Sequence, residues 1–161
     1  MPEMTLLGWF HTILGILAVL SGFYTLYRHR VISTEESSGI LYVLVTVLVA
    51  GSALGIYNQG GFGVAHVLAV LTLIALAGGY IMERFKWFGS FSKYFQALGY
   101  TSTLLFHMIP AITDFLRRLP VGDPFIDSFE DPLLLNFHTA FLFIYLLGLV
   151  AQMIWLKRQA V

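Results

Sequence analysis

The chain has 161 residues, no cysteine and a formal net charge of zero, with 58% hydrophobic and only 11% charged residues. Soluble domains carry roughly a quarter charged residues, so this composition and a mean hydropathy of +0.80 exclude a soluble or nucleic-acid-binding domain. The missing cysteine excludes disulfides, cysteine-held iron–sulfur clusters and haem attached through a cysteine motif. The composition therefore predicts an integral membrane protein.

Apolar runs bounded by glycine, proline or charged residues follow one another along the chain, each near the roughly 20 residues that span a bilayer. They predict helices at residues 5–27, 39–57, 61–82, 94–116 and 132–156. A segment in lipid must satisfy its own backbone groups, and the alternation that a barrel requires is absent. The predicted fold is an all-α bundle of five transmembrane helices, forming a single domain over residues 1–161.

The first run begins in "MPEMTLLGWFHTILG", which lacks a basic region and a small-residue cleavage site, so we expect a permanent helix rather than a signal peptide. Positive residues collect in cytoplasmic loops. With five spans, one side receives most of the positive residues: Arg28, Arg30, Arg84, Lys86, Lys93, Lys157 and Arg158. The other side receives only Arg117 and Arg118. We therefore expect an outer N-terminus and a cytoplasmic C-terminus in the bacterial inner membrane.

Four of the five histidines fall inside predicted spans, one on each of four helices: His11, His66, His107 and His138. At 1.5 Å per residue, three lie roughly 9 Å and His107 roughly 14 Å below the outer surface. Ionisable residues within spans are rare and usually face the bundle interior. The sequence thus predicts one outer-leaflet site built from these four rings, although contacts between helices are the alternative for each.

Neighbouring residues add detail to this predicted site. Gly15 lies four residues after His11 on the same helix face, where a flat or bulky group would find room. Asp114 shares the face of His107, and a carboxylate often orients a ligating imidazole or transfers protons. The last helix carries a polar residue every seven positions, either a hydrogen-bond path or a set of interhelix contacts: His138, Tyr145 and Gln152.

The first cofactor that fits this pattern is haem b, which needs two neutral imidazoles, small residues beside the macrocycle and aromatic residues around it. Arg117 and Arg118 would pair with the propionates as planar donors. No histidine layer exists in the inner half, so a redox reaction would face outward, toward quinol, superoxide or an external electron carrier. An electron-transfer protein or membrane oxidoreductase is the predicted function.

Two alternatives remain open at this stage. The same four histidines, with Asp114, could hold a non-haem zinc, copper or iron ion, although the usual pairs spaced three or four residues apart are absent. The chain could instead be a structural or assembly subunit of a larger membrane complex, given its small size and its aromatic content of 16%. Transport is less favoured, because paired broken helices are lacking.

A histidine that opens the first span, a following glycine and a basic element before the second span resemble a broad group of small uncharacterised bacterial membrane proteins. The residues are His11, Gly15, His29 with Arg30, and "GILYVL" at 39–44. The resemblance covers the first three helices, departs at "ISTEESS", and implies the helical topology but no settled activity. The four histidines are also similar, in a general way, to four-helix b-type cytochromes, which place ligands in both leaflets.

Overall fold

The computed structural model describes residues 4–57 and 61–159. Within these ranges the chain is all-helical and holds no strand, which confirms the predicted fold class. The helices are α1 (Leu6–His29), α2 (Ser37–Ala53), α3 (Val64–Phe85), the short 3-10 turn η1 (Gly89–Phe91), α4 (Ser92–Arg118) and α5 (Pro132–Arg158). Each predicted helix is present, with its bounds shifted by a few residues.

Side-chain caps and turns fix where several helices begin and end. The Thr5 hydroxyl accepts a hydrogen bond from the Gly8 amide at the start of α1. Asp131 caps α5 in the same way, and Pro132 occupies the first helical position, where its missing N–H costs nothing. α1 and α3 end at Arg30 and Lys86, whose positive φ angles turn the chain out of the helix.

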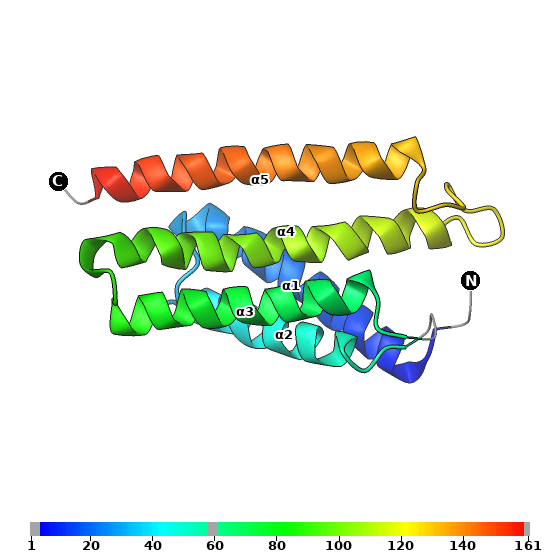
Figure 1. Cartoon of the computed structure of the whole chain (residues 1–161), viewed down its shortest axis with the longest axis horizontal. Coiled ribbons are helices and arrows are strands. Elements are labelled where there is room, and N and C mark those ends of the chain that lie inside the picture. Colours follow the sequence, from blue (N-terminus) through cyan, green and yellow to red (C-terminus); the bar gives the residue numbers. More distant parts are fainter. Residues whose placement is uncertain (1–3, 58–60, 160–161) are drawn as a thin grey trace.

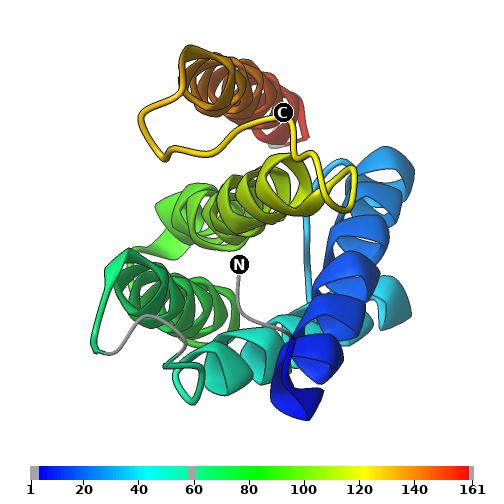
Figure 2. The ribbon, with the colours of Figure 1, turned by 90° about the vertical axis from the view of Figure 1, so that its right-hand side faces the viewer.

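The helices form a ring with one helix outside it. α3, α4 and α5 run side by side, and α1 and α2 cross behind them (Figure 1). Seen along the bundle, α1 to α4 surround a central space, and α5 packs mainly against α4 (Figure 2). α1 and α5 begin at the same end, where α4 also ends, so helices that follow one another run in opposite directions.

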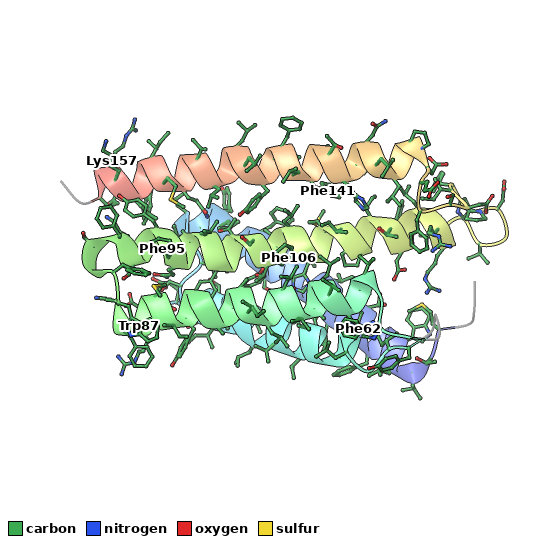
Figure 3. The ribbon with its side chains drawn as sticks, in the orientation of Figure 1. Phe62, Trp87, Phe95, Phe106, Phe141 and Lys157 are labelled. Atoms are coloured by element: carbon green, nitrogen blue, oxygen red, sulfur yellow. The ribbon has the colours of Figure 1, made fainter. Side chains whose placement is uncertain are left out.

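Among the described residues, three helices are long and apolar enough to cross a bilayer, namely α1, α3 and α5. α2 is also apolar but has only 17 residues. Side chains on the outside are largely apolar, and Figure 3 shows Phe62 and Trp87 near opposite ends of α3. A membrane protein is supported, whereas five spans and the side that each terminus faces stay predictions.

Two tyrosine rings pack directly against glycines of neighbouring helices. A Cβ added to Gly22 would lie 2.7 Å from the Tyr42 ring, and one added to Gly79 would lie 2.8 Å from the Tyr100 ring. Both tyrosines are fully buried. The Tyr42 hydroxyl also bonds the Thr103 hydroxyl at 2.6 Å, which connects α2 to α4. Glycine at these positions lets aromatic rings approach a neighbouring backbone.

A single carboxylate ties together three parts of the chain at the end of the bundle where α1 ends. Glu83 of α3 accepts five hydrogen bonds at 2.6–3.0 Å. The donors are the Ser33 hydroxyl, the backbone N–H and the hydroxyl of Thr34, the side-chain amide of Gln96 and the Tyr100 hydroxyl. These donors come from the α1–α2 connection and from α4. Glu83 therefore holds the connection against α3 and α4.

Polar residues hold α5 on α4. The three residues that recur every seven positions each bond a hydroxyl of α4, as His138 with Thr113, Tyr145 with Ser102, and Gln152 with Thr101. Their distances are 2.8–3.2 Å. The stripe predicted on the last helix is therefore a set of interhelix contacts, the alternative to a hydrogen-bond path.

We predict that Glu83→Ala lowers the free energy of unfolding by about 3 kcal/mol, because it leaves several partly buried donors without their acceptor. Chemical denaturation in detergent, followed by circular dichroism, measures this change. Glu35→Ala, which removes an exposed carboxylate from the nearby connection, is the matched control and should change stability by less than about 0.5 kcal/mol. Equal effects of the two substitutions would contradict the role of Glu83.

Candidate functional site

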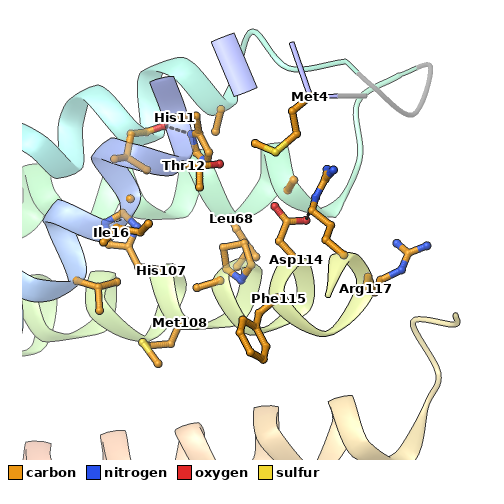
Figure 4. A pocket seen from close by; sticks show the side chains of 18 of the residues that line it. Met4, His11, Thr12, Ile16, Leu68, His107, Met108, Asp114, Phe115 and Arg117 are labelled. Atoms are coloured by element: carbon orange, nitrogen blue, oxygen red, sulfur yellow. Dashed lines mark hydrogen bonds and ion pairs between the residues drawn. The ribbon is translucent and has the colours of Figure 1, made fainter. Parts of the chain in front are cut away.

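A cavity of about 980 Å³ lies among α1, α2, α3 and α4, in the half of the bundle where α1 begins. Its walls are mostly apolar, and its mouth, the end nearest the start of α1, is lined by Met4, Leu119, Val121, Gly122 and Pro124. This volume is at the upper end of small-molecule and cofactor sites, roughly 300–1,000 Å³. The polar side chains that line it are His11, Thr12, Thr72, His107, Asp114, Arg117 and Arg118, several of them labelled in Figure 4.

His11 is held in one orientation by α2. Its Nδ1 lies 3.2 Å from the Val49 carbonyl oxygen and 3.1 Å from the Ser52 hydroxyl. Because a carbonyl oxygen only accepts, Nδ1 carries the proton and donates it. The Nε2 atom of this neutral ring keeps its lone pair, and it has no hydrogen-bond partner among residues 4–57 and 61–159. A backbone carbonyl on the other ring nitrogen is the usual support of a metal-ligating histidine.

His107 supplies the second imidazole of the cavity, from α4. The residue is buried, and its Nε2 lies 3.2 Å from the Thr46 hydroxyl of α2. The edge of its ring meets Tyr42, with the ring centroids 6.5 Å apart. Both histidines of the cavity are thus positioned by α2, the helix that carries no histidine.

The mouth of the cavity carries cationic groups with unmet hydrogen-bonding capacity. The Nε atoms of Arg117 and Arg118 are buried without a hydrogen-bond partner in the described part of the chain. Asp114 is half-exposed and lies 3.6 Å from Arg118 Nε. The guanidinium of Arg117 stacks on Phe129, 3.8 Å from the ring centroid. An anionic group at this mouth would find two arginines, and only Arg118 has an acidic neighbour within ion-pair distance among the described residues.

The predicted orienting role of Asp114 is not what this geometry shows. The carboxylate pairs with Arg118, while His11 is oriented by the Val49 carbonyl. The reason is helix direction: Asp114 lies two turns beyond His107 toward the mouth, where the arginines of the same helix are nearer. Asp114 remains a cavity-lining carboxylate at the mouth, and proton transfer there stays a prediction.

His66 does not line this cavity and caps a helix instead. The Gly63 amide donates to His66 Nδ1 at 3.1 Å, an interaction that closes the start of α3. Because Nδ1 accepts, the proton of the neutral ring lies on Nε2, so neither nitrogen offers a free lone pair to a metal. The ring packs between Tyr57 and Phe62, with centroids 4.7 and 5.0 Å away. The prediction of His66 as a ligand is corrected accordingly.

His138 also lies away from the cavity. It sits on α5, outside the helical ring, and its Nε2 bonds the Thr113 hydroxyl of α4 at 3.2 Å. The residue is one of the contacts that hold α5 in place. The prediction that His138 contributes to a common site is therefore also corrected. The polar residues of α5 face α4, and no residue of α5 lines the cavity.

The four imidazoles share a layer of the bundle but not a point. Each lies nearer the helix end at which α1 begins, yet only two line a common cavity. In the part of the chain that the structure describes, no three His, Asp or Glu side chains lie close enough to hold one metal ion. Other predicted site residues do gather at the cavity with the two histidines: Gly15, Asp114, Arg117 and Arg118.

Sequence reasoning missed the partners of the two imidazoles. The Val49 carbonyl, Ser52 and Thr46 all belong to α2, the helix without a histidine. The signal for these partners is the pair of small hydroxyl residues, Thr46 and Ser52, in a largely apolar run. In lipid, such hydroxyls find partners on neighbouring helices, and histidine is a suitable one.

Comparisons with models of protein families, with curated proteins and with solved structures found no significant match. The resemblances drawn from short motifs therefore stay predictions, and function has to be inferred from the geometry of the site.

We predict that His66→Ala loosens the start of α3 and destabilises the protein by about 1 kcal/mol, the usual cost of losing a helix cap. Hydrogen exchange at residues 63–67 measures this loss. His66→Gln is the control, because a glutamine at this position can reach back to the same amide and should restore protection. Ligand binding in the cavity should be the same in all three proteins, and a change in it would contradict the assigned role.

Proposed function

We propose that the chain binds one b-type haem in the cavity among α1 to α4 and takes part in electron transfer or a redox reaction at the membrane. The observation that carries the proposal is the state of His11. Its imidazole is fixed through Nδ1 by a backbone carbonyl, its Nε2 has no hydrogen-bond partner among the described residues, and the residue lines a large, mostly apolar cavity. That arrangement is what an axial haem ligand requires.

The donor set supports a haem with His11 as the first ligand. His107 lies on the facing helix α4 and would be the second; its Nε2 bonds the Thr46 hydroxyl in this structure. Haem supplies one-electron redox chemistry when it is bound. The protein contributes a fixed imidazole, a low-dielectric surrounding and the exclusion of bulk water, which together set the reduction potential.

The shape and charge of the cavity support the rest of the cofactor. A Cβ added to Gly15 meets no atom within 4 Å, so this wall has open space beside His11. At the mouth, the buried Nε atoms of Arg117 and Arg118 would donate to the propionates, and these charge-assisted bonds would satisfy them. The apolar ring of the haem would lie among the apolar residues inside the cavity, and its carboxylates would lie at the mouth beside the arginines.

The other two hypotheses gain less from the geometry. A non-haem zinc, copper or iron centre would use His11, His66, His107 and His138, of which two are engaged elsewhere. A purely structural subunit would have no need for a large cavity beside which His11 Nε2 and the Nε atoms of Arg117 and Arg118 lack hydrogen-bond partners among the described residues. Quinol or an external electron carrier remains the proposed redox partner, since the cavity opens at the end predicted to face outward.

We predict that protein produced with adequate haem has an intense Soret band and that His11→Ala loses it, because the oriented axial ligand is gone. His107→Ala should retain pigment but change from a six-coordinate to a five-coordinate spectrum. His138→Ala is the matched control, because it removes an imidazole of the same layer outside the cavity, and its spectrum should equal that of the parent. A colourless parent protein would end the proposal, and one stoichiometric metal ion without porphyrin would replace it with the metal hypothesis.

A second test fills the cavity without touching a ligand. We expect Gly15→Leu to fold normally, since its Cβ enters open space, yet to bind at least about tenfold less haem, because the side chain occupies the volume beside His11. Haem titration of the apoprotein measures this. Gly51→Leu, at an exposed glycine of α2 with equally open surroundings, should bind haem like the parent. Unchanged binding in Gly15→Leu would place the ligand elsewhere.

A further inference from the structure

A second cavity of about 540 Å³ lies between α1, α4 and α5. Its lining is almost wholly apolar, with Phe23 and Leu26 on one side and Phe141 and Ile144 on the other. α5 is held by its polar contacts with α4, so protein does not fill the space between α5 and α1. Gly148 lines this groove, and a Cβ added there meets no atom within 4 Å.

The dimensions of the groove match one leaflet of a bilayer. Along α5 its lining runs from Phe141 to Trp155, which is about 21 Å at 1.5 Å per residue. The hydrocarbon of one leaflet is about 15 Å thick, half of the bilayer core. An extended acyl chain with its glycerol would therefore fit along the groove.

One end of the groove is basic. Arg30 lines it beside Trp155, and the Arg30 carbonyl accepts a hydrogen bond from Gln152 at 2.9 Å, which fixes the backbone there. The Arg30 side chain is exposed and has no ion-pair partner among the residues that the structure describes. Further positive charges lie in the last turns of the helices that end here: Arg28, Lys157 and Arg158.

We propose that this groove binds one anionic phospholipid, with an acyl chain between α1 and α5 and the phosphate at Arg30. Lipid is the solvent around α1 and α5, so an acyl chain is the apolar occupant that reaches the groove. The basic end selects an anionic headgroup over a zwitterionic one, and Trp155 lies where tryptophans favour the interface. The inference is independent of haem and concerns the opposite half of the bundle.

Trp155 makes the test local. A variant with Trp9→Phe and Trp87→Phe leaves Trp155 as the single tryptophan. It is reconstituted in phosphatidylcholine vesicles containing a small share of brominated lipid, either phosphatidylglycerol or phosphatidylcholine. Bromine quenches tryptophan at contact. Brominated phosphatidylglycerol should occupy the groove about fivefold more strongly, the factor given by about 1 kcal/mol for one arginine at an anionic headgroup.

Three substitutions in this background decide the outcome. Arg30→Gln should bring the preference to about one, Arg30→Lys should keep most of it, and Lys157→Gln should leave it unchanged, because Lys157 is basic but does not line the groove. Gly148→Leu should weaken quenching by both lipids. Equal quenching by the two brominated lipids in the parent, or equal effects of Arg30→Gln and Lys157→Gln, would overturn the proposal, the latter by showing only diffuse surface attraction.

Discussion

The five hydrogen bonds accepted by Glu83 are the constraint on which the rest of the bundle depends. A carboxylate near the end of a membrane bundle is costly unless its oxygens are satisfied, and here a carboxylate of α3 takes its donors from two other segments, the α1–α2 connection and α4. Satisfying them draws the α1–α2 connection against α3 and α4 and closes the ring of helices at that end. Tyr42 against Gly22 and Tyr100 against Gly79 extend the closure inward. Beyond them the ring opens, and the cavity with His11 and His107 occupies the opening.

The two imidazoles are oriented by a helix that carries no imidazole of its own. α2 offers a carbonyl and a serine to His11 and a threonine to His107. This division of labour has a physical reason. A histidine in an apolar surrounding needs one satisfied ring nitrogen to fix its orientation, and the partner must come from a neighbouring helix because its own backbone is already bonded. The helix without a histidine therefore decides which nitrogen of His11 is free.

The sequence was sufficient for the helices and for the layer in which the histidines lie, because depth follows from counting residues along a helix. The direction in which a side chain points around the helix axis does not follow from counting. Each residue turns by about 100°, and the rotation of the whole helix in the bundle is set by packing. Gly15, Arg117 and Arg118 line the cavity and their roles toward a cofactor stay predictions, whereas His138 belongs to the seven-residue stripe that faces α4. For His66 the sequence carries a signal of a structural role. A glycine three residues before a histidine places an acceptor beside the first free amide of a helix.

Met108 of α4 lines both cavities, so the two adjoin at this residue. Their linings nevertheless call for different occupants. The first holds imidazole, carboxylate and guanidinium groups around an apolar centre, which suits a cofactor with a polar edge. The second has scarcely any polar surface until its basic end, which suits a lipid. A ligand that moved from the groove toward the first cavity would have to displace Met108 and would then meet buried His107, whose hydrogen bond with Thr46 must be replaced. That exchange is unfavourable for an acyl chain, which has no polar atom to offer, and favourable for a group that binds nitrogen. The proposed lipid and the proposed cofactor would therefore occupy opposite halves of the bundle, because the imidazoles line only the first cavity.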